Sequence, residues 1–249
     1  MAKCLSIIAA FVNVLVASSM AVKCPGDVTY TLTWRGSWST ENHPNATLPS
    51  GAHFSNLIGC THGSEYIMWR TGMMASPGVK LVAEEGQTGT LETEIKVQKD
   101  AEKVWQVILP GFGLGAEAEK TDIEVKVTPD YSKVSLISML GPSPDWYVGI
   151  DSHDLCNDGQ WRKTWDVTML PPYDSGTDSG LQFESSDQPT VPPQPIFRIN
   201  NTMEGAFKAN NAIKSLGEFR FKLMDNSAGK DCVNLLMIVS VTSIVAFMF

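Results

Sequence analysis

The sequence lacks the short motifs that mark common catalytic and nucleotide-binding sites. It has no Gly-x-Ser-x-Gly elbow, no phosphate-binding loop, no dinucleotide fingerprint, and no His-Glu-x-x-His or Cys-x-x-Cys spacing. Its 249 residues include only four histidines and five cysteines, which are scattered along the chain. We therefore expect neither an enzyme nor a zinc centre. A glycosidase needs only two carboxylates, so it is kept as a minor alternative.

Basic residues are also scarce. Lysine and arginine number 19 against 27 aspartates and glutamates, which gives a net charge of -8. If Lys3 is removed with a leader segment, as argued next, the charge becomes -9. An acidic surface disfavours nucleic acid and anionic membranes as main partners. It is compatible with an extracellular protein that binds cations.

The amino end has the composition of a secretory signal. Lys3 precedes a mostly apolar stretch, residues 5–17, and Ser19-Met20-Ala21 supplies the small residues of a cleavage site. This pattern predicts a signal peptide over residues 1–21. The domain that folds outside the cell is then expected to span residues 22–226.

The carboxyl end predicts a lipid anchor. Residues 233–249 carry no charge and follow the small residues Asn226-Ser227-Ala228-Gly229. A small-residue site followed by an apolar tail is the pattern of a removable GPI signal. We interpret residues 227–249 as that signal, with attachment at Asn226 or Ser227. A retained hydrophobic anchor is the alternative.

Secretion predicts oxidised cysteines and glycosylated asparagines. After signal removal Cys24, Cys60, Cys156 and Cys232 are left, and at least one disulfide is expected in an oxidising compartment. Cys60 lies in an apolar run, so we expect a buried free thiol there. The sequons at Asn45 and Asn200 predict N-glycans on surface loops.

Most of the remaining chain has the pattern of β-strands. Short alternating or apolar runs, rich in β-branched and aromatic residues, are separated by glycine and proline. These runs cover residues 28–34, 91–97, 104–109, 122–127, 134–140, 146–150, 165–169, 196–199 and 218–223. Only residues 55–60 and 79–85 have helical character, and residues 203–216 are expected to form turns or a loop. The pattern predicts an antiparallel β-sandwich with one or two short helices.

Acidic residues gather in two stretches rich in glycine and proline. Asp145, Asp151 and Asp154 lie within residues 141–156, and Asp174 and Asp178 within residues 171–180. Loops at one end of a sandwich can meet, and their carboxylates repel unless a cation neutralises them. Calcium takes about 6–8 oxygen ligands and suits such a site, although the second stretch does not match an EF-hand loop. Aspartates in turns are also common simply as solvated turn formers.

Ordered motifs along the chain resemble the spondin N-terminal domain family. The residues that carry the resemblance are Trp34-Arg35-Gly36-Ser37-Trp38-Ser39, His43-Pro44, His62-Gly63-Ser64-Glu65-Tyr66-Ile67-Met68-Trp69, Ala75-Ser76-Pro77-Gly78-Val79, Ala83-Glu84-Glu85-Gly86, Pro142-Ser143-Pro144-Asp145-Trp146 and Tyr173-Asp174-Ser175-Gly176-Thr177-Asp178-Ser179-Gly180. The similarity extends from about Cys24 to Leu223.

The resemblance implies a fold and a set of site residues. The implied fold is an eight-stranded antiparallel sandwich with short helices. One calcium ion is implied, and its ligands correspond to Glu124, Asp145 and Asp174. Substitute ligands or supporting residues would be Asp122, Asp151 and Asp178. The family also implies a disulfide between Cys24 and Cys156.

The expected function is recognition outside the cell. We expect a calcium-binding adhesion module at the outer cell surface that contacts a matrix protein, a glycan or a cell-surface receptor. A structural acidic matrix protein with a calcium site and no specific receptor is the main alternative. Trp34, Trp38, Trp69 and Trp146 could form a sugar-stacking surface, but on strands we expect them in the core.

Overall fold

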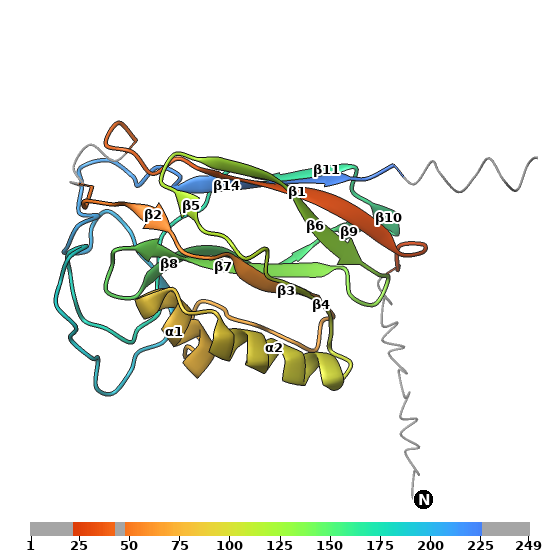
Figure 1. The fold of residues 1–249 in the computed structure, drawn as a ribbon, viewed down its shortest axis with the longest axis horizontal. Coiled ribbons are helices and arrows are strands. Elements are labelled where there is room, and N and C mark those ends of the chain that lie inside the picture. Colours follow the sequence, from red (N-terminus) through yellow and green to blue (C-terminus); the bar gives the residue numbers. More distant parts are fainter. Residues whose placement is uncertain (1–21, 43–47, 226–249) are drawn as a thin grey trace, which may run out of the picture.

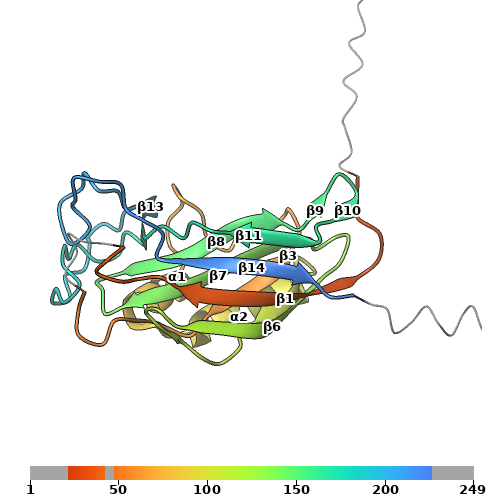
Figure 2. The same cartoon turned by 90° about the horizontal axis from the view of Figure 1, so that it is seen from above.

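The computed structural model describes residues 22–42 and 48–225, which form two packed antiparallel sheets with a pair of helices against one of them (Figure 1). The first sheet has the order β11-β14-β1-β6, and its strands run side by side in Figure 2. They are β1 (Val28–Gly36), β6 (Glu119–Val127), β11 (Thr164–Val167) and β14 (Gly217–Leu223).

The second sheet is built around two long neighbouring strands, β7 (Lys133–Gly141) and β8 (Trp146–Asp154). Its path is β13-β12-β8-β7-β2-β5, and β3 pairs with both β7 and β4. The remaining members are β2 (His53–Phe54), β3 (Ile58–His62), β4 (Val104–Ile108), β5 (Leu114–Gly115), β12 (Tyr173–Asp174) and β13 (Phe197–Arg198). A separate hairpin joins β9 (Cys156–Asn157) and β10 (Gln160–Trp161).

Eight of these strands have four or more residues, namely β1, β3, β4, β6, β7, β8, β11 and β14. The predicted antiparallel sandwich is therefore confirmed. Its core follows from the period of two in the strands, since alternate residues such as Tyr30, Leu32 and Trp34 of β1 point between the sheets and are fully buried. Trp34, Trp38, Trp69 and Trp146 are all buried, as the core interpretation predicted.

Two helices cover the outer face of the second sheet. They are α1 (Pro77–Glu85) and α2 (Gly89–Asp100). A second apolar cluster fills the space between them and β3, β4, β7 and β8, and it includes Val79, Leu91, Ile95 and Ile137. Because β7 is covered on both faces, its residues are almost all buried. This explains its nearly continuous apolar sequence.

Two of the secondary-structure predictions are wrong. Residues 91–97 were expected to form a strand because Leu91, Ile95 and Val97 alternate with polar residues, but they lie within α2. Leu91 and Ile95 are four apart and both face the sheet, whereas Val97 is exposed. Residues 55–60 were expected to have helical character, but from Ile58 onward they belong to β3. The expected helix over residues 79–85 lies within α1.

The cysteines behave as expected. Cys24 and Cys156 form a disulfide with an S–S distance of 2.03 Å. Cys60 is a buried free thiol in the layer between sheet and helices, and burial raises the pKa of its thiol. The disulfide joins the start of the described chain to the far end of β8.

Several predictions fall outside the described residues: the signal peptide, the sequon at Asn45, Cys232, and the anchor site at Asn226 or Ser227. Asn200 is exposed, and its Oδ1 accepts hydrogen bonds from the N and Oγ1 of Thr202. Its glycosylation stays a prediction. Within residues 22–42 and 48–225, no helix has the length and apolar character needed to cross a membrane.

Candidate metal site

Asp145 ends the connection between the two central strands of the second sheet. Ser143 closes the turn, because its Oγ accepts a hydrogen bond of 3.1 Å from the backbone N–H of Trp146, the first residue of β8. Pro144 lies between them and restricts the backbone. The turn leaves the Asp145 side chain fully buried.

Asp174 reaches the same place through strand pairing. It is the second residue of β12 and pairs directly with Trp146, the residue after Asp145. The backbone N–H of Ser175 donates to the carbonyl of Asp145 at 3.1 Å. Residues separated by 29 positions in the sequence are thus brought together by the β8–β12 register.

The loop after Asp174 wraps one oxygen of Asp145. Oδ2 of Asp145 accepts hydrogen bonds from the N–H of Thr177 at 2.8 Å, the N–H of Asp178 at 3.1 Å and the Oγ of Ser175 at 2.9 Å. Gly176 makes the wrap possible, because it has φ 76° and a Cβ there would lie 2.1 Å from the carbonyl oxygen of Gln194.

The other oxygen of Asp145 has a different environment. Oδ1 is buried and accepts no hydrogen bond from any donor in the described residues. A buried carboxylate oxygen without a partner is costly, so it calls for a proton or a cation close by. Burial raises the pKa of Asp145, and the neighbouring negative charge of Asp178 raises it further. The three hydrogen bonds donated to Oδ2 lower the pKa without cancelling this rise.

Asp174 is also a buried carboxylate, and it lies near the negative charge of Asp145. Its Oδ1 accepts from the N–H of Gly176 at 2.8 Å, and its Oδ2 accepts from the indole N–H of Trp146 at 3.2 Å. Burial, followed by the negative charge of Asp145, raises the pKa of Asp174 to about 7. Two carboxylates held together in this way are neutralised either by a shared proton or by a metal ion.

A comparison of the sequence with known proteins identifies the family. The family model Spondin_N matches residues 28–211. The chain belongs to the spondin N-terminal family. Spondin-1 from Gallus gallus is 40% identical over 179 residues, which cover 69% of this chain and 22% of that protein. Spondin-2 from Rattus norvegicus is 35% identical over 172 residues, or 68% of this chain and 52% of that protein.

Spondin-2 from Homo sapiens is 33% identical over 175 residues, which cover 70% of this chain and 53% of that protein. The chain therefore spans about half the length of these spondin-2 proteins and a smaller part of spondin-1. These relatives indicate an extracellular module related to matrix and adhesion. The fold and the disulfide expected from the spondin resemblance are both present.

The structure does not bring Glu124 to the two aspartates. Glu124 lies on β6 in the first sheet, its side chain is 55% exposed, and it forms an ion pair of 2.8 Å with Lys126. The expectation that Glu124, Asp145 and Asp174 converge is therefore wrong for Glu124. In the described part of the chain, no group of three or more histidine, cysteine, aspartate or glutamate side chains is arranged to hold a metal ion.

The three supporting aspartates have different positions. Asp122 is exposed on β6 and Asp151 pairs with Arg70 at 2.5 Å, so neither faces the Asp145 carboxylate. Asp178 does belong to this end of the molecule. Its Oδ1 accepts from the N–H of Gly180 at 2.6 Å and its Oδ2 from that of Gln188 at 2.9 Å, so it closes the loop that wraps Asp145.

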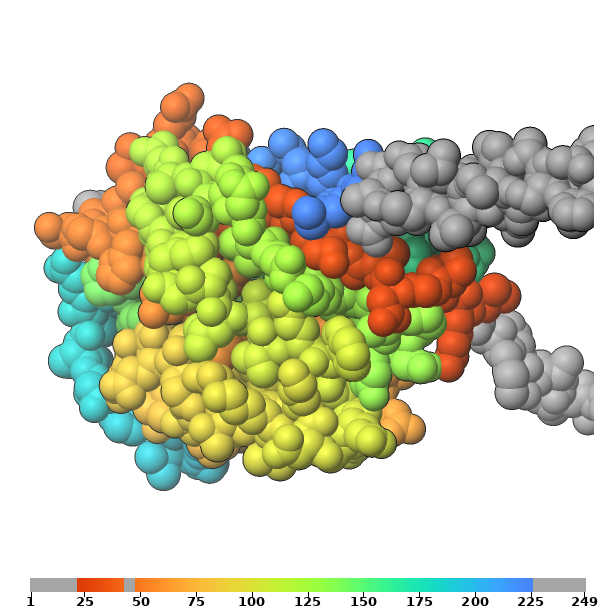
Figure 3. Space-filling view, turned by 45° about the vertical axis from the view of Figure 1, so that its right-hand side comes forward, coloured from red at the N-terminus to blue at the C-terminus, as the bar shows by residue number. Residues whose placement is uncertain are grey.

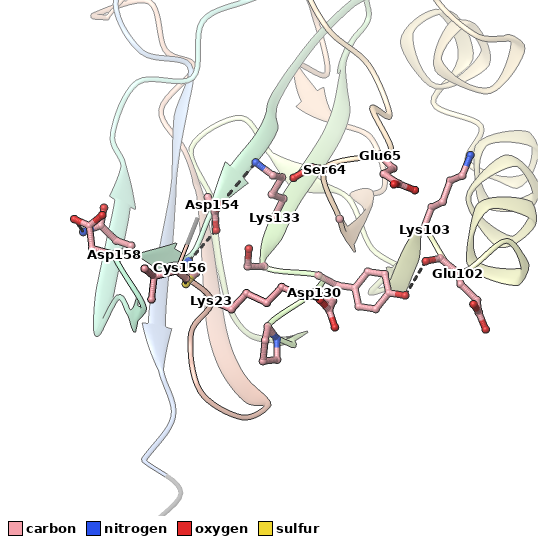
Figure 4. A pocket seen from close by; sticks show the side chains of 16 residues that line it. Lys23, Ser64, Glu65, Glu102, Lys103, Asp130, Lys133, Asp154, Cys156 and Asp158 are labelled. Atoms are coloured by element: carbon pink, nitrogen blue, oxygen red, sulfur yellow. Dashed lines mark hydrogen bonds and ion pairs between the residues drawn. The ribbon is translucent and has the colours of Figure 1, made fainter. Parts of the chain in front are cut away.

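A separate hollow of about 590 Å³ lies at the opposite end of β8 (Figure 4). Four of its eight charged side chains form the pairs Lys133–Asp154 and Lys23–Asp130. Its three lysines offset three of its five carboxylates, so it is less suited to a metal ion. The aspartate pair is the stronger candidate site.

Proposed function

We propose that this spondin domain binds one calcium ion at Asp145 and Asp174 and uses that end of the sandwich for adhesion or recognition outside the cell. The observation that supports a cation is the buried Oδ1 of Asp145, which has no hydrogen-bond donor among the described residues. Bound calcium would neutralise the two carboxylates. Because calcium takes about 6–8 oxygens, carbonyl, hydroxyl or water oxygens would supply the other ligands.

The residues around the pair would preorganise the site. Thr177, Asp178 and Ser175 fix Oδ2 of Asp145, and Trp146 and Gly176 fix the Asp174 carboxylate. Both side chains are thereby held with little freedom left to lose on binding, which favours affinity. The ion would in turn brace the loop that presents the recognition surface.

Titration calorimetry with calcium on the metal-free domain tests the proposal. We expect one ion to bind the unaltered protein, and Asp145→Asn or Asp174→Asn to weaken affinity at least tenfold, because each removes a charged ligand. Asp151→Asn is the matched control, since Asp151 is an acid on β8, the strand that follows Asp145, and it pairs with Arg70. Absence of calcium binding, or unchanged affinity in Asp145→Asn, would refute the site.

The partner is proposed to be a matrix protein, a glycan or a cell-surface receptor. A binding screen against such molecules, with calcium and with a chelator, separates this from the structural alternative. A specific partner whose binding is lost with the chelator and in Asp174→Asn supports recognition. Binding to none of them supports an acidic matrix protein with a purely structural calcium site.

A glycosidase is disfavoured by the geometry of the pair. Retaining and inverting enzymes place a sugar between carboxyl groups about 5 Å or more apart. Asp145 is fully buried and Asp174 is only 9% exposed, so neither carboxyl group is open to a sugar. We propose no catalytic role for them.

We also propose that the mature domain is tethered by a GPI anchor at Asn226 or Ser227. Cells that express the full chain would release it on treatment with a phosphatidylinositol-specific phospholipase C. Release with the lipase and not with buffer supports the lipid anchor. Retention under both conditions supports the hydrophobic anchor instead.

A further inference from the structure

We propose that the hollow at the disulfide end of the sandwich binds a neutral oligosaccharide, and that the exposed Trp105 beside it stacks on a sugar ring. We call it the disulfide-end hollow, because Cys156 lies in its wall. The inference goes beyond the proposed function, since this hollow lies at the opposite end of β8 from Asp145 and Asp174 and needs no metal ion.

Five separate segments of the chain form the wall of the disulfide-end hollow. They are residues 22–23, 63–65, 102–103, 129–133 and 154–158. Figure 3 shows the yellow end of the helical segment, the green segment that follows β6 and the red start of the described chain meeting on one side of the molecule. The volume of about 590 Å³ lies within the range of roughly 300–1,000 Å³ that is usual for small-ligand sites.

The charges around the hollow select a neutral ligand. Three lysines and five carboxylates line it, and the pairs Lys133–Asp154 and Lys23–Asp130 account for four of them. The excess of carboxylates disfavours a sulfated or acidic glycan, and the lysines disfavour a cationic ligand. An uncharged molecule with many hydroxyl groups is the class that remains.

Polar side chains free to bind hydroxyl groups come from two neighbouring segments. Ser64 and Glu65 follow β3, and Lys103 follows α2; Figure 4 labels all three. In the part of the chain that the structure describes, Glu65 and Lys103 form no side-chain hydrogen bond and no ion pair. A sugar hydroxyl both donates and accepts, so it suits a carboxylate acceptor, an ammonium donor and a serine hydroxyl on one wall.

An aromatic pair extends this wall. All seven tryptophans lie in the described residues, and Trp105 is the only one of them that is exposed, at 43%. Its ring stacks on that of Tyr131, which lines the hollow, with the ring centroids 6.1 Å apart and the planes at 18°. One face of a pyranose ring presents C–H groups, and these pack on a flat aromatic surface of this kind.

The aromatic side of the hollow is already fixed without a ligand. The hydroxyl of Tyr131 donates to the carbonyl of Glu102 at 2.7 Å, and its backbone N–H donates to the carbonyl of Thr128 at 3.0 Å. The N–H of Glu102 donates in turn to the carbonyl of Lys99 at 3.0 Å. The turn after β6 and the end of α2 are thereby tied together, so little conformational freedom would be lost on binding.

Calorimetry with neutral tetrasaccharides tests the inference. The probes are chitotetraose, laminaritetraose, maltotetraose and mannotetraose, with a heparin tetrasaccharide as the charged comparison. We expect at least one neutral probe to bind the unaltered protein equally with calcium and with a chelator. Trp105→Ala should weaken that binding at least about fivefold, and Trp105→Phe should weaken it less, because it keeps an aromatic ring.

Further variants separate the hollow from the rest of the surface. Glu65→Ala and Lys103→Ala should each weaken binding at least about threefold, because each removes a hydrogen-bonding partner of the sugar. Met169→Ala is the matched control for Trp105→Ala, since Met169 is 39% exposed and lies outside the wall of the hollow. It should leave the affinity unchanged, and so should Asp145→Asn.

Tryptophan fluorescence gives a second readout that a merely structural role would not produce. Stacking of a sugar should change the emission of the unaltered protein in proportion to the calorimetric binding. In Trp105→Phe the emission change should disappear even where calorimetry still detects binding.

The outcomes that overturn this inference differ from those that overturn the calcium site. If no neutral probe binds, or if only the heparin tetrasaccharide binds, the inference is refuted. A neutral probe whose binding is lost with the chelator and in Asp145→Asn, but not in Trp105→Ala, belongs to the aspartate end and also refutes it. Failure of the protein to bind calcium would refute the proposed function and leave this inference standing.

Discussion

His62 and Asp145 are both completely buried titratable side chains, but only His62 has a hydrogen-bond partner for each of its polar side-chain atoms. The Nδ1 of His62 lies 2.8 Å from the carbonyl oxygen of Gly63, and its Nε2 lies 2.8 Å from the Oγ of Ser135. A neutral imidazole satisfies both contacts, by donating to the carbonyl and accepting from the hydroxyl. Asp145 keeps one oxygen without a donor in the described chain. The fold satisfies the polar atoms of His62, whereas Asp145 keeps the unpartnered oxygen that supports the proposed calcium site.

The lowered pKa of His62 predicts that the folded protein loses stability in acid. Burial lowers its pKa below 6.5, although the Gly63 hydrogen bond and the charge of Asp151 oppose this, while Lys133 and Arg70 add to it. The unfolded chain therefore takes up the proton first, so this contribution is full above pH 6.5 and is lost as the pH falls below it. The loss is at most about 1.4 kcal/mol per pH unit.

Urea unfolding between pH 7.5 and pH 5 measures this effect. The comparison is the slope of unfolding free energy against pH in the unaltered protein and in His62→Gln, since contributions of distant groups cancel in the difference. The variant should show a shallower acid loss even if it is less stable throughout. Equal slopes would mean that His62 is not kept neutral by the fold.

The raised pKa of Asp174 predicts the opposite dependence of folding stability on pH. Its raised pKa means that the folded, metal-free protein holds a proton that the unfolded chain has released, so this contribution is full below about pH 3.8 and is lost as the pH rises through about 7. At pH 8 without metal the two carboxylates repel. Asp174→Asn should then raise the melting temperature, although it costs the hydrogen bond from Trp146, worth about 1 kcal/mol.

Scanning calorimetry with a chelator and with excess calcium tests this prediction. With calcium the order should reverse, because only the unaltered protein gains stability from the ion. At pH 5 without metal the advantage of the variant should shrink, since Asp174 is then protonated. A variant that is less stable at pH 8 in the chelator would show that the carboxyl pair is not repulsive.

At the scale of elements, the Glu94 side chain of α2 joins the two helices by accepting hydrogen bonds from the start of α1. The Oγ of Ser76, the N-cap of α1, accepts from the N–H of Val79 and donates to Glu94 of α2 at 2.6 Å. The other oxygen of Glu94 accepts from the N–H of Gly78 at 2.7 Å. Glu94 thus satisfies a free donor at the start of α1, where helices favour negative charge. The helix layer therefore acts as a unit.

Gly78→Ala should destabilise this pair, although alanine is the better helix former. A Cβ at residue 78 would lie 2.5 Å from the Cα of Leu91, so the helices would have to move apart. We expect a cost of about 1–3 kcal/mol, as for other overpacked sites. Gly89→Ala is the control, because a Cβ there meets nothing within 4 Å. Urea unfolding should show no loss for it, and equal losses in both variants would contradict close packing as the cause.

Most of the long strands could be predicted from the sequence because their periods are local, whereas β3 and α2 could not. Leu91, Thr93, Ile95 and Val97 have the alternation of a strand, and only packing against β3 and β4 selects the helical spacing of Leu91 and Ile95. The aspartates of the site were predictable, since each lies in a turn-rich motif of the family. The position of Glu124 was not, because only the tertiary fold shows that β6 belongs to the other sheet.

On the scale of the whole molecule, the two ends of β8 are held in place in different ways. Asp145 precedes its first residue, and the disulfide partner Cys156 lies two residues after its last. Nine residues at about 3.3 Å each put these ends roughly 30 Å apart. The bond between Cys24 and Cys156 closes a segment with a sequence separation of 132, which includes every strand from β1 to β8. One end is therefore constrained covalently, and the other depends on the proposed ion.

The double variant Cys24→Ser/Cys156→Ser should show whether the two ends of β8 are independent of each other. Loss of a crosslink over so long a segment should cost about 2–5 kcal/mol, chiefly because the unfolded chain is no longer restricted. Calcium affinity of the protein that is still folded should stay within about twofold, since no contact of the aspartate pair involves the disulfide end. Unfolding in urea and calorimetry with calcium measure the two quantities on one sample. A stability loss accompanied by a large loss of affinity would show that the two ends are coupled through β8, so that the sandwich transmits strain along its central strand.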